Sequence, residues 1–295
     1  MKILYTRDLN GQDYLCDVIF YGLSQLPNIE ITDAPRMWYM YKDEFSPKGT
    51  HTLRDLYGRG FTVWGLMNEK PVDRHNVEQR IRDHYYDIVI LSRVDHKSPY
   101  LDLILENYKS NELITLDGED GPNINMFLAN NSTYFKRELM NTVNNVLPIS
   151  FGIPDEKCRL TPQSKTQAWS RSIPGAGYNF ENQDDYHNDY AKSLFGVTFK
   201  KSGWDCMRHY EILANRSIPY FKDINSLPAN ICKTLPRELL IQAKQRVDKE
   251  GAEYFLPGNP GWGEYQIMEQ EIHEQFMQHG PVSKVAEYIL QNIKK

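Results

Sequence analysis

Residues 190–221 read YAKSLFGVTFKKSGWDCMRHYEILANRSIPYF, two short apolar runs on either side of an amphipathic segment. Residues 194–199 and 217–221 are rich in β-branched and aromatic side chains, as strands are, whereas residues 205–215 have helical length and spacing. A strand, a helix and a second strand in succession form a βαβ unit, which places its two strands parallel in one sheet. The stretch therefore predicts a parallel α/β fold.

A basic loop precedes the predicted helix and contains Lys200, Lys201, Gly203 and Trp204. The N-terminus of a helix presents N–H groups without helical partners and the positive end of the helix dipole, so anions bind there. Two lysines and a glycine at this point suit a diphosphate. We therefore predict that these four residues belong to a donor-binding site.

One face of the predicted helix is polar, because Arg208, Glu211 and Asn215 follow one another at i, i+3 and i+7. An arginine holds phosphate oxygens in a fork, and a carboxylate one turn further along accepts hydrogen bonds from the two hydroxyls of a ribose. The spacing thus fits a nucleoside diphosphate lying along the helix. The alternative is that Asp205, Arg208 and Glu211 only form ion pairs on a solvated helix face.

The pattern S-x-F-G-x-(x)3-K-x-G-(x)4-R-x-Y-E-(x)6-I-P, residues 193–219, resembles the nucleotide-binding segment of exostosin-like and related glycosyltransferases of the GT-B fold. Residues 116–120 and 134–139 are similar to segments of small bacterial and viral glycosyltransferase-like proteins. The resemblance implies two Rossmann-like domains that face a cleft, with C-terminal helices that cross back to the first domain. It also implies a UDP- or GDP-sugar donor whose ribose binds Glu211, and no cofactor.

Composition narrows the classes of protein to consider. The 295 residues are 40% hydrophobic and 25% charged, which is typical of a globular chain long enough for two domains. The net charge of −5 argues against a broad nucleic-acid-binding surface. The four cysteines show neither zinc-site spacing nor a disulfide framework, and no run approaches the ~20 apolar residues that span a bilayer. We therefore expect a cytoplasmic protein without a transmembrane segment.

The first half of the chain has the pattern of a doubly wound sheet, in which strands alternate with helices. We expect strands at residues 3–6, 29–33, 86–92, 113–116 and 146–152, and helices at 14–26, 77–84, 101–108 and 134–143. Residues 35–66 fit no single periodic element. Because long excursions from compact domains are often functional, this segment is a candidate for contact with the acceptor.

The second half continues with a strand within residues 168–173 and with helices at 184–192, 237–248, 262–277 and 282–293. The chain leaves the first domain through Pro154. The prolines and glycines of residues 257–261, PGNPG, interrupt regular secondary structure before the last two helices. We expect an acceptor-side domain at 1–153, a donor nucleotide-binding domain at 154–261, and helices at 262–295 that pack across both.

Acidic residues cluster where the first-domain strands end. Asp117, Glu119 and Asp120 follow one predicted strand, while Asp8 and Asp95 follow two others. Ligands of open α/β sheets bind beyond the carboxyl ends of the strands, so these carboxylates are expected around one crevice. We predict that the catalytic base is Asp117, Glu119 or Asp120, with Asp8 or Asp95 as second candidates. The cluster is also compatible with helix capping and loop solvation.

Together these features predict a glycosyltransferase that moves a sugar from a nucleotide sugar to a glycan or other hydroxyl acceptor. We expect no metal, because Lys200, Lys201 and Arg208 supply the positive charge that a metal would provide. A metal-dependent GT-A-type transferase is the second hypothesis, since the D-x-E-D turn at 117–120 carries the oxygen ligands that Mn²⁺ or Mg²⁺ prefers. The same features are compatible with a sugar-nucleotide epimerase or hydrolase, and with a non-catalytic carbohydrate-binding module. His96, His187 and His209 are expected to be polar surface or core residues and not catalytic ones.

Overall fold

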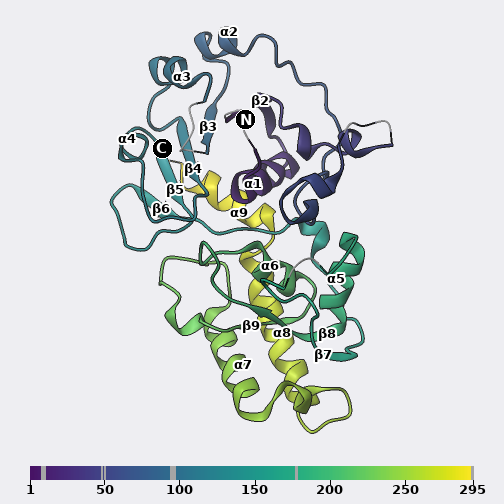
Figure 1. Ribbon diagram of the computed structural model, residues 1–295. Helices are drawn as coiled ribbons and strands as arrows, with labels where there is room; N and C mark the ends of the chain where they lie inside the picture. Colours follow the sequence, from purple (N-terminus) through teal and green to yellow (C-terminus); the bar gives the residue numbers. More distant parts are fainter. Residues whose placement is uncertain (8–10, 48, 50, 94–97, 177–178, 294–295) are drawn as a thin grey trace.

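The computed structural model describes residues 1–7, 11–47, 49, 51–93, 98–176 and 179–293. Two parallel sheets, one in each half of the chain, organise the fold (Figure 1). The larger sheet has the strand order β2-β1-β3-β4-β5-β6. Its strands are β1 (Lys2–Thr6), β2 (Glu30–Ala34), β3 (Ile88–Ser92), β4 (Leu113–Asp117), β5 (Thr133–Lys136) and β6 (Val146–Pro148). The order reverses between β1 and β3, and this is where such sheets bind ligands.

Both faces of the larger sheet are covered, and successive side chains of a strand contribute to opposite cores. Ile3 and Tyr5 of β1 join the core on the side of helix α1, whereas Leu4 joins a second core on the other side. That second core is completed by three short helices, α2 (Val77–Arg82), α3 (Leu101–Asn107) and α4 (Met126–Asn131). Helix α1 (Tyr14–Gln25) is capped at its N-terminus by Asp13, whose carboxylate accepts a hydrogen bond from the Cys16 amide at 2.9 Å.

The irregular excursion after β2 contains four 3-10 helices, η1 (Trp38–Met40), η2 (Lys42–Phe45), η3 (Leu53–Asp55) and η4 (Tyr57–Gly60). Its base is tied to the sheet through Asp33, which pairs with Arg74 at 2.7 Å and accepts a hydrogen bond from Tyr41 at 3.0 Å. Farther along the excursion, the Arg59 guanidinium donates to the Phe180 carbonyl at 2.9 Å, so this segment contacts the second domain.

The smaller sheet has the order β7-β8-β9, and all its strands are parallel. They are β7 (Gln167–Trp169), β8 (Ser193–Thr198) and β9 (Ile218–Phe221), and the helices around them are α5 (Gln183–Lys192), α6 (Met207–Ala214), α7 (Arg237–Glu250) and α8 (Trp262–His279). The short turns η5 (Asp155–Lys157), η6 (Ile224–Ser226) and η7 (Ala252–Phe255) complete this half. The βαβ unit predicted from residues 190–221 is therefore present as β8, α6 and β9.

The last helix returns to the first domain. Helix α8 packs against α6 and α7, whereas α9 (Val282–Gln291) packs against α1 (Figure 1). Two glycines permit this close approach: a Cβ on Gly22 would lie 2.8 Å from the Val282 carbonyl oxygen, and one on Gly152 would lie 2.9 Å from the Val282 Cα. Two parallel-sheet domains joined by a returning C-terminal helix confirm the predicted α/β, GT-B-like fold class.

The helix expected at residues 134–143 is wrong, because residues 133–136 form strand β5 and turns follow. Lys136, Arg137 and Glu138 gave this segment the polarity of a surface helix, yet all three are buried. Their charges are neutralised by neighbouring charged side chains instead of by water. The strand expected at 146–152 is shorter than predicted, since only residues 146–148 pair, and helix α4 was not anticipated.

Within the described ranges, no helix combines the length and the apolar character that crossing a membrane requires.

Replacing Gly22 by alanine should lower the free energy of unfolding by about 1–2 kcal/mol. Overpacking costs about 1–3 kcal/mol, and the better helix propensity of alanine returns up to about 1 kcal/mol. Gly263→Ala in α8 is the matched control, because nothing lies within 4 Å of the added Cβ there. Urea unfolding of both variants checks the prediction. Equal stability of the two would show that α9 does not depend on a glycine at position 22.

Candidate active site

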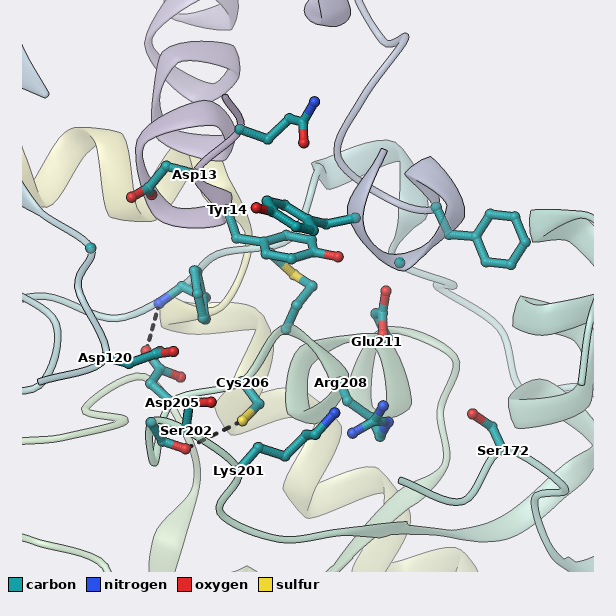
Figure 2. Close-up of a pocket in the computed structure, with 18 of the residues that line it drawn as sticks. Asp13, Tyr14, Asp120, Ser172, Lys201, Ser202, Asp205, Cys206, Arg208 and Glu211 are labelled. Atoms are coloured by element: carbon teal, nitrogen blue, oxygen red, sulfur yellow. Dashed lines mark hydrogen bonds between the residues drawn. The ribbon is translucent and has the colours of Figure 1, made fainter. Parts of the chain in front are cut away.

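A cavity of about 870 Å³ lies between the two domains. The first domain contributes the turn between β1 and α1, part of the 57–61 segment and the turn after β4. The second domain contributes the loop before α5, the loop between β8 and α6, and the first turns of α6 (Figure 2). The carboxyl ends of strands from both sheets thus face one cavity, which is where α/β proteins bind ligands.

Four of the six predicted donor-binding residues line this cavity: Lys201, Gly203, Arg208 and Glu211. Lys200 and Trp204 do not line the cavity, and their predicted place in the donor site is corrected on this ground. The Lys200 amide donates to the Asp223 carboxylate at 3.2 Å, and its ammonium lies 5.3 Å from the centre of the Trp204 ring. Only one of the two lysines, Lys201, therefore lines the cavity.

Arg208 projects from helix α6 into the pocket (Figure 2). Its Nε is buried and has no hydrogen-bond partner in the described part of the chain. A buried guanidinium nitrogen without a partner is costly, since it has lost its hydration. This cost would be removed by an anionic ligand. Lys201, on the same side of the cavity, adds a second positive charge.

Glu211 lies one turn beyond Arg208 and is only 6% exposed. Its two carboxylate oxygens accept hydrogen bonds of 2.5 Å, one from the Thr62 hydroxyl and one from the Tyr186 hydroxyl. Burial raises the pKa of Glu211, and these hydrogen bonds oppose the rise. A carboxylate has about four acceptor positions, so positions remain for a ligand in the cavity.

The loop before α6 is anchored on the first domain by Asp205. Its amide donates to Glu138 at 2.9 Å, and its carboxylate accepts from the Phe151 amide at 2.9 Å and from the Tyr210 hydroxyl at 2.7 Å. Burial raises the pKa of Asp205 to about 6 in spite of the nearby Arg137 guanidinium. These bonds fix the start of α6, and with it the end of the helix that faces the cavity.

The acidic turn after β4 divides between the core and the cavity. Glu119 and Asp120 line the cavity, and Asp120 is paired with Arg137. Asp117 is 1% exposed and does not line it, because its carboxylate accepts from the Lys136 ammonium at 2.8 Å and from the Tyr134 hydroxyl at 2.6 Å. The prediction of Asp117 as a catalytic base is corrected on this ground.

Asp8 and Asp95, the second-choice acids, lie outside the described residues, as does His96. His187 and His209 are buried, and burial lowers their pKa values to about 3 and about 4. Both rings are therefore neutral near neutral pH, and neither lines the cavity.

Sequence reasoning missed Asp13, the N-cap of α1, whose side chain lines the cavity (Figure 2). A Cβ on Gly118 would lie 2.6 Å from Asp13 Oδ1, so the glycine leaves room for this carboxylate. An aspartate that caps a helix directly after the first strand was the available signal. Thr62, Tyr186 and Arg137 were also missed, because their roles depend on contacts between segments far apart in sequence.

Among the residues that the structure describes, no group of three or more His, Cys, Asp or Glu side chains is arranged to hold a metal ion.

Neither a scan against protein-family models nor a search of curated proteins gives a match. A search of solved structures finds an alpha-glucosyltransferase in complex with UDP and a 13-mer DNA containing a central A:G mismatch. The two chains are 10% identical with a TM-score of 0.49, and the alignment covers 100% of this chain and 99% of that one.

Asp117→Asn should lower the free energy of unfolding by about 3–5 kcal/mol, the usual cost of removing one partner of a buried ion pair. The Lys136 ammonium would lose the carboxylate that pairs with it at 2.8 Å, in a site with no exposure to water. Glu119→Gln, two residues away on the cavity, is the control and should change stability by less than about 1 kcal/mol. Urea unfolding measures both, and a stable Asp117→Asn protein would contradict the structural role.

Proposed function

We propose that this protein is a glycosyltransferase that moves a sugar from a nucleoside diphosphate sugar, of the UDP or GDP type, to a hydroxyl acceptor. The observation that carries the proposal is that Lys201, in the loop before α6, and Arg208 and Glu211, in α6 itself, line one cavity between two parallel-sheet domains. The resemblance of residues 193–219 to exostosin-like glycosyltransferases supports it.

The donor lies along the first turns of α6 in this proposal. Its diphosphate binds at the N-terminus of the helix, where the dipole, Arg208 and Lys201 all favour negative charge. Three residues of helix advance about 4.5 Å, so Glu211 is placed to accept hydrogen bonds from the ribose. The sugar then points toward the first domain.

Glycosyl transfer breaks the bond between the sugar and the diphosphate, and negative charge develops on the departing phosphate. Fixed positive groups aimed at that charge stabilise the transition state, because they need no reorganisation during the reaction. Lys201, Arg208 and the helix N-terminus supply such groups, so transfer is proposed to proceed without a metal.

The acceptor is a glycan or another uncharged hydroxyl compound in this proposal. The first-domain side of the cavity carries the carboxylates of Asp13, Glu119 and Asp120, which repel anions. Tyr57, 63% exposed at the same side, offers an aromatic face for a sugar ring. We assign the role of general base to Asp13, because Asp120 is paired with Arg137, whereas the Asp13 carboxylate lines the cavity and accepts a hydrogen bond from the Cys16 amide of its own helix.

Lys201→Gln should weaken the binding of UDP or GDP about tenfold to hundredfold, since a hydrogen bond to a charged group contributes about 1.5–3 kcal/mol. Lys200→Gln is the matched control, because the neighbouring lysine lies outside the cavity. Titration calorimetry on the wild type and both variants gives the affinities. If the wild type binds neither nucleotide, or if both variants bind alike, the donor site is misassigned.

Asp13→Asn should slow transfer by roughly 10²–10⁴-fold, the usual contribution of a general base, with little change in donor affinity. Turnover is measured with a panel of acceptor sugars and the donor that binds. The wild-type enzyme should keep its activity in EDTA. Complete loss in EDTA with recovery in Mn²⁺ would favour a metal-dependent transferase, and normal turnover of Asp13→Asn would shift the base to Glu119 or Asp120.

A further inference from the structure

Glu211 is held by hydroxyl groups from both domains. Tyr186 belongs to α5 of the second domain, whereas Thr62 follows η4 in the first. The Thr62 hydroxyl is fully buried, and it lies 149 residues from Glu211 in sequence. One side chain of the proposed donor site is therefore oriented by the opposite domain.

The direction of each hydrogen bond behind Thr62 is fixed by its neighbours. The Arg159 Nε donates to Asn215 Oδ1 at 2.8 Å, so the Asn215 amide nitrogen faces His187 Nδ1, 2.7 Å away. The ring is neutral, because burial lowers the pKa of His187 to about 3. Nδ1 accepts the hydrogen bond, and Nε2 therefore carries the proton.

His187 Nε2 lies 3.2 Å from the Thr62 hydroxyl oxygen. Because the ring donates there, the hydroxyl must use its own proton for the Glu211 carboxylate, 2.5 Å away. The chain Asn215–His187–Thr62 thus has one consistent order of donors and acceptors, and it ends on Glu211. An ordered network of this kind rigidifies the group at its end.

The backbone also holds Thr62 in place. Its φ is 77°, in the left-handed region that β-branched residues rarely adopt, and its amide donates to Gln183 Oε1 at 3.2 Å. Next to it, the Phe61 ring lies 5.5 Å from the Tyr186 ring. A strained backbone residue fixed by its surroundings is more often found at functional sites than elsewhere.

Thr62 and Tyr186 occupy one acceptor position on each oxygen of Glu211, and this fixes the plane of the carboxylate. The positions that remain can accept from two neighbouring hydroxyls of a ligand. Binding to a group that is already oriented avoids the entropic cost of ordering it.

We propose that Thr62 and Tyr186 are positioning residues that orient Glu211 toward the two hydroxyls of the donor ribose, so that the first domain contributes to nucleotide recognition. The inference rests on the proposed function. It predicts that the preference for a ribonucleotide over its 2′-deoxy form depends on a threonine hydroxyl that does not itself touch the nucleotide.

Calorimetry on the full chain tests this inference. The wild type is titrated with UDP and GDP, and the tighter binder is then compared with its 2′-deoxy form. The wild type should prefer the ribose form by about tenfold or more, the effect of one hydrogen bond to a charged group. Thr62→Val, which keeps the shape of the side chain, should weaken binding of the ribose form about tenfold and bring the ratio of the two affinities close to one.

Thr62→Ser restores the hydroxyl and should restore the ratio. Tyr186→Phe keeps the aromatic packing and should reduce the ratio of the ribose to the 2′-deoxy affinity, as Thr62→Val does. This second variant tests the inference even if the valine variant does not fold. Thr234→Val is the matched control, because this half-buried hydroxyl contacts Tyr210 and does not line the cavity.

Variants with lower affinity for both nucleotides but a wild-type ratio would show that the hydroxyls serve only the fold. Variants with wild-type affinity would overturn the inference as well. In both cases the proposed function would stand, since the wild type still binds. Failure of the wild type to bind UDP or GDP would instead overturn the proposed function and this inference with it.

Discussion

The start of helix α6 depends on a buried charge cluster that joins the two domains. Arg137 is 3% exposed, pairs with Glu138 at 3.1 Å and reaches the Asp205 carbonyl, while Glu138 accepts the Asp205 amide. Burying these charges is tolerable only because each has partners. This close packing explains why residue 203 is a glycine, because a Cβ there would lie 2.6 Å from Glu138 Oε1. The glycine in the loop thus allows close packing against the first domain, a reason that the anion-binding interpretation did not include.

Contacts other than those at the start of α6 also join the two domains. Helix α9 returns against Gly22 and Gly152, and the Ile153 and Pro281 segments form a short bridge. On another side, the Arg59 guanidinium donates to the Phe180 carbonyl at 2.9 Å. Contacts that fix the two domains relative to one another determine how the cavity residues of one domain face those of the other. The chemistry proposed for the cavity is therefore sensitive to residues far from it.

The parts of the fold with local patterns were predictable, and the parts set by distant partners were not. Residues 190–221 carry their periodicity within one stretch, so β8, α6 and β9 follow from sequence. Strand β5 did not follow, because its charges find partners such as Asp117 that only the sheet brings close. The same reason separates Glu211, which helical spacing placed on the polar face, from Thr62, whose contact with it spans 149 residues. Asp13 could have been found, since capping is a local signal.

Charged side chains of both signs line the cavity from both domains, and two groups of them are placed as the proposed group transfer requires. Lys201 and Arg208 lie on the second-domain side, where a leaving phosphate would gain negative charge. Asp13 and Glu119 lie on the first-domain side, where an attacking hydroxyl must lose a proton. The net charge of −5 belongs to the whole chain and does not describe how charges are distributed in the cavity. A chain that is acidic overall can thus bind an anionic donor, provided that its few cations are gathered where the phosphate lies.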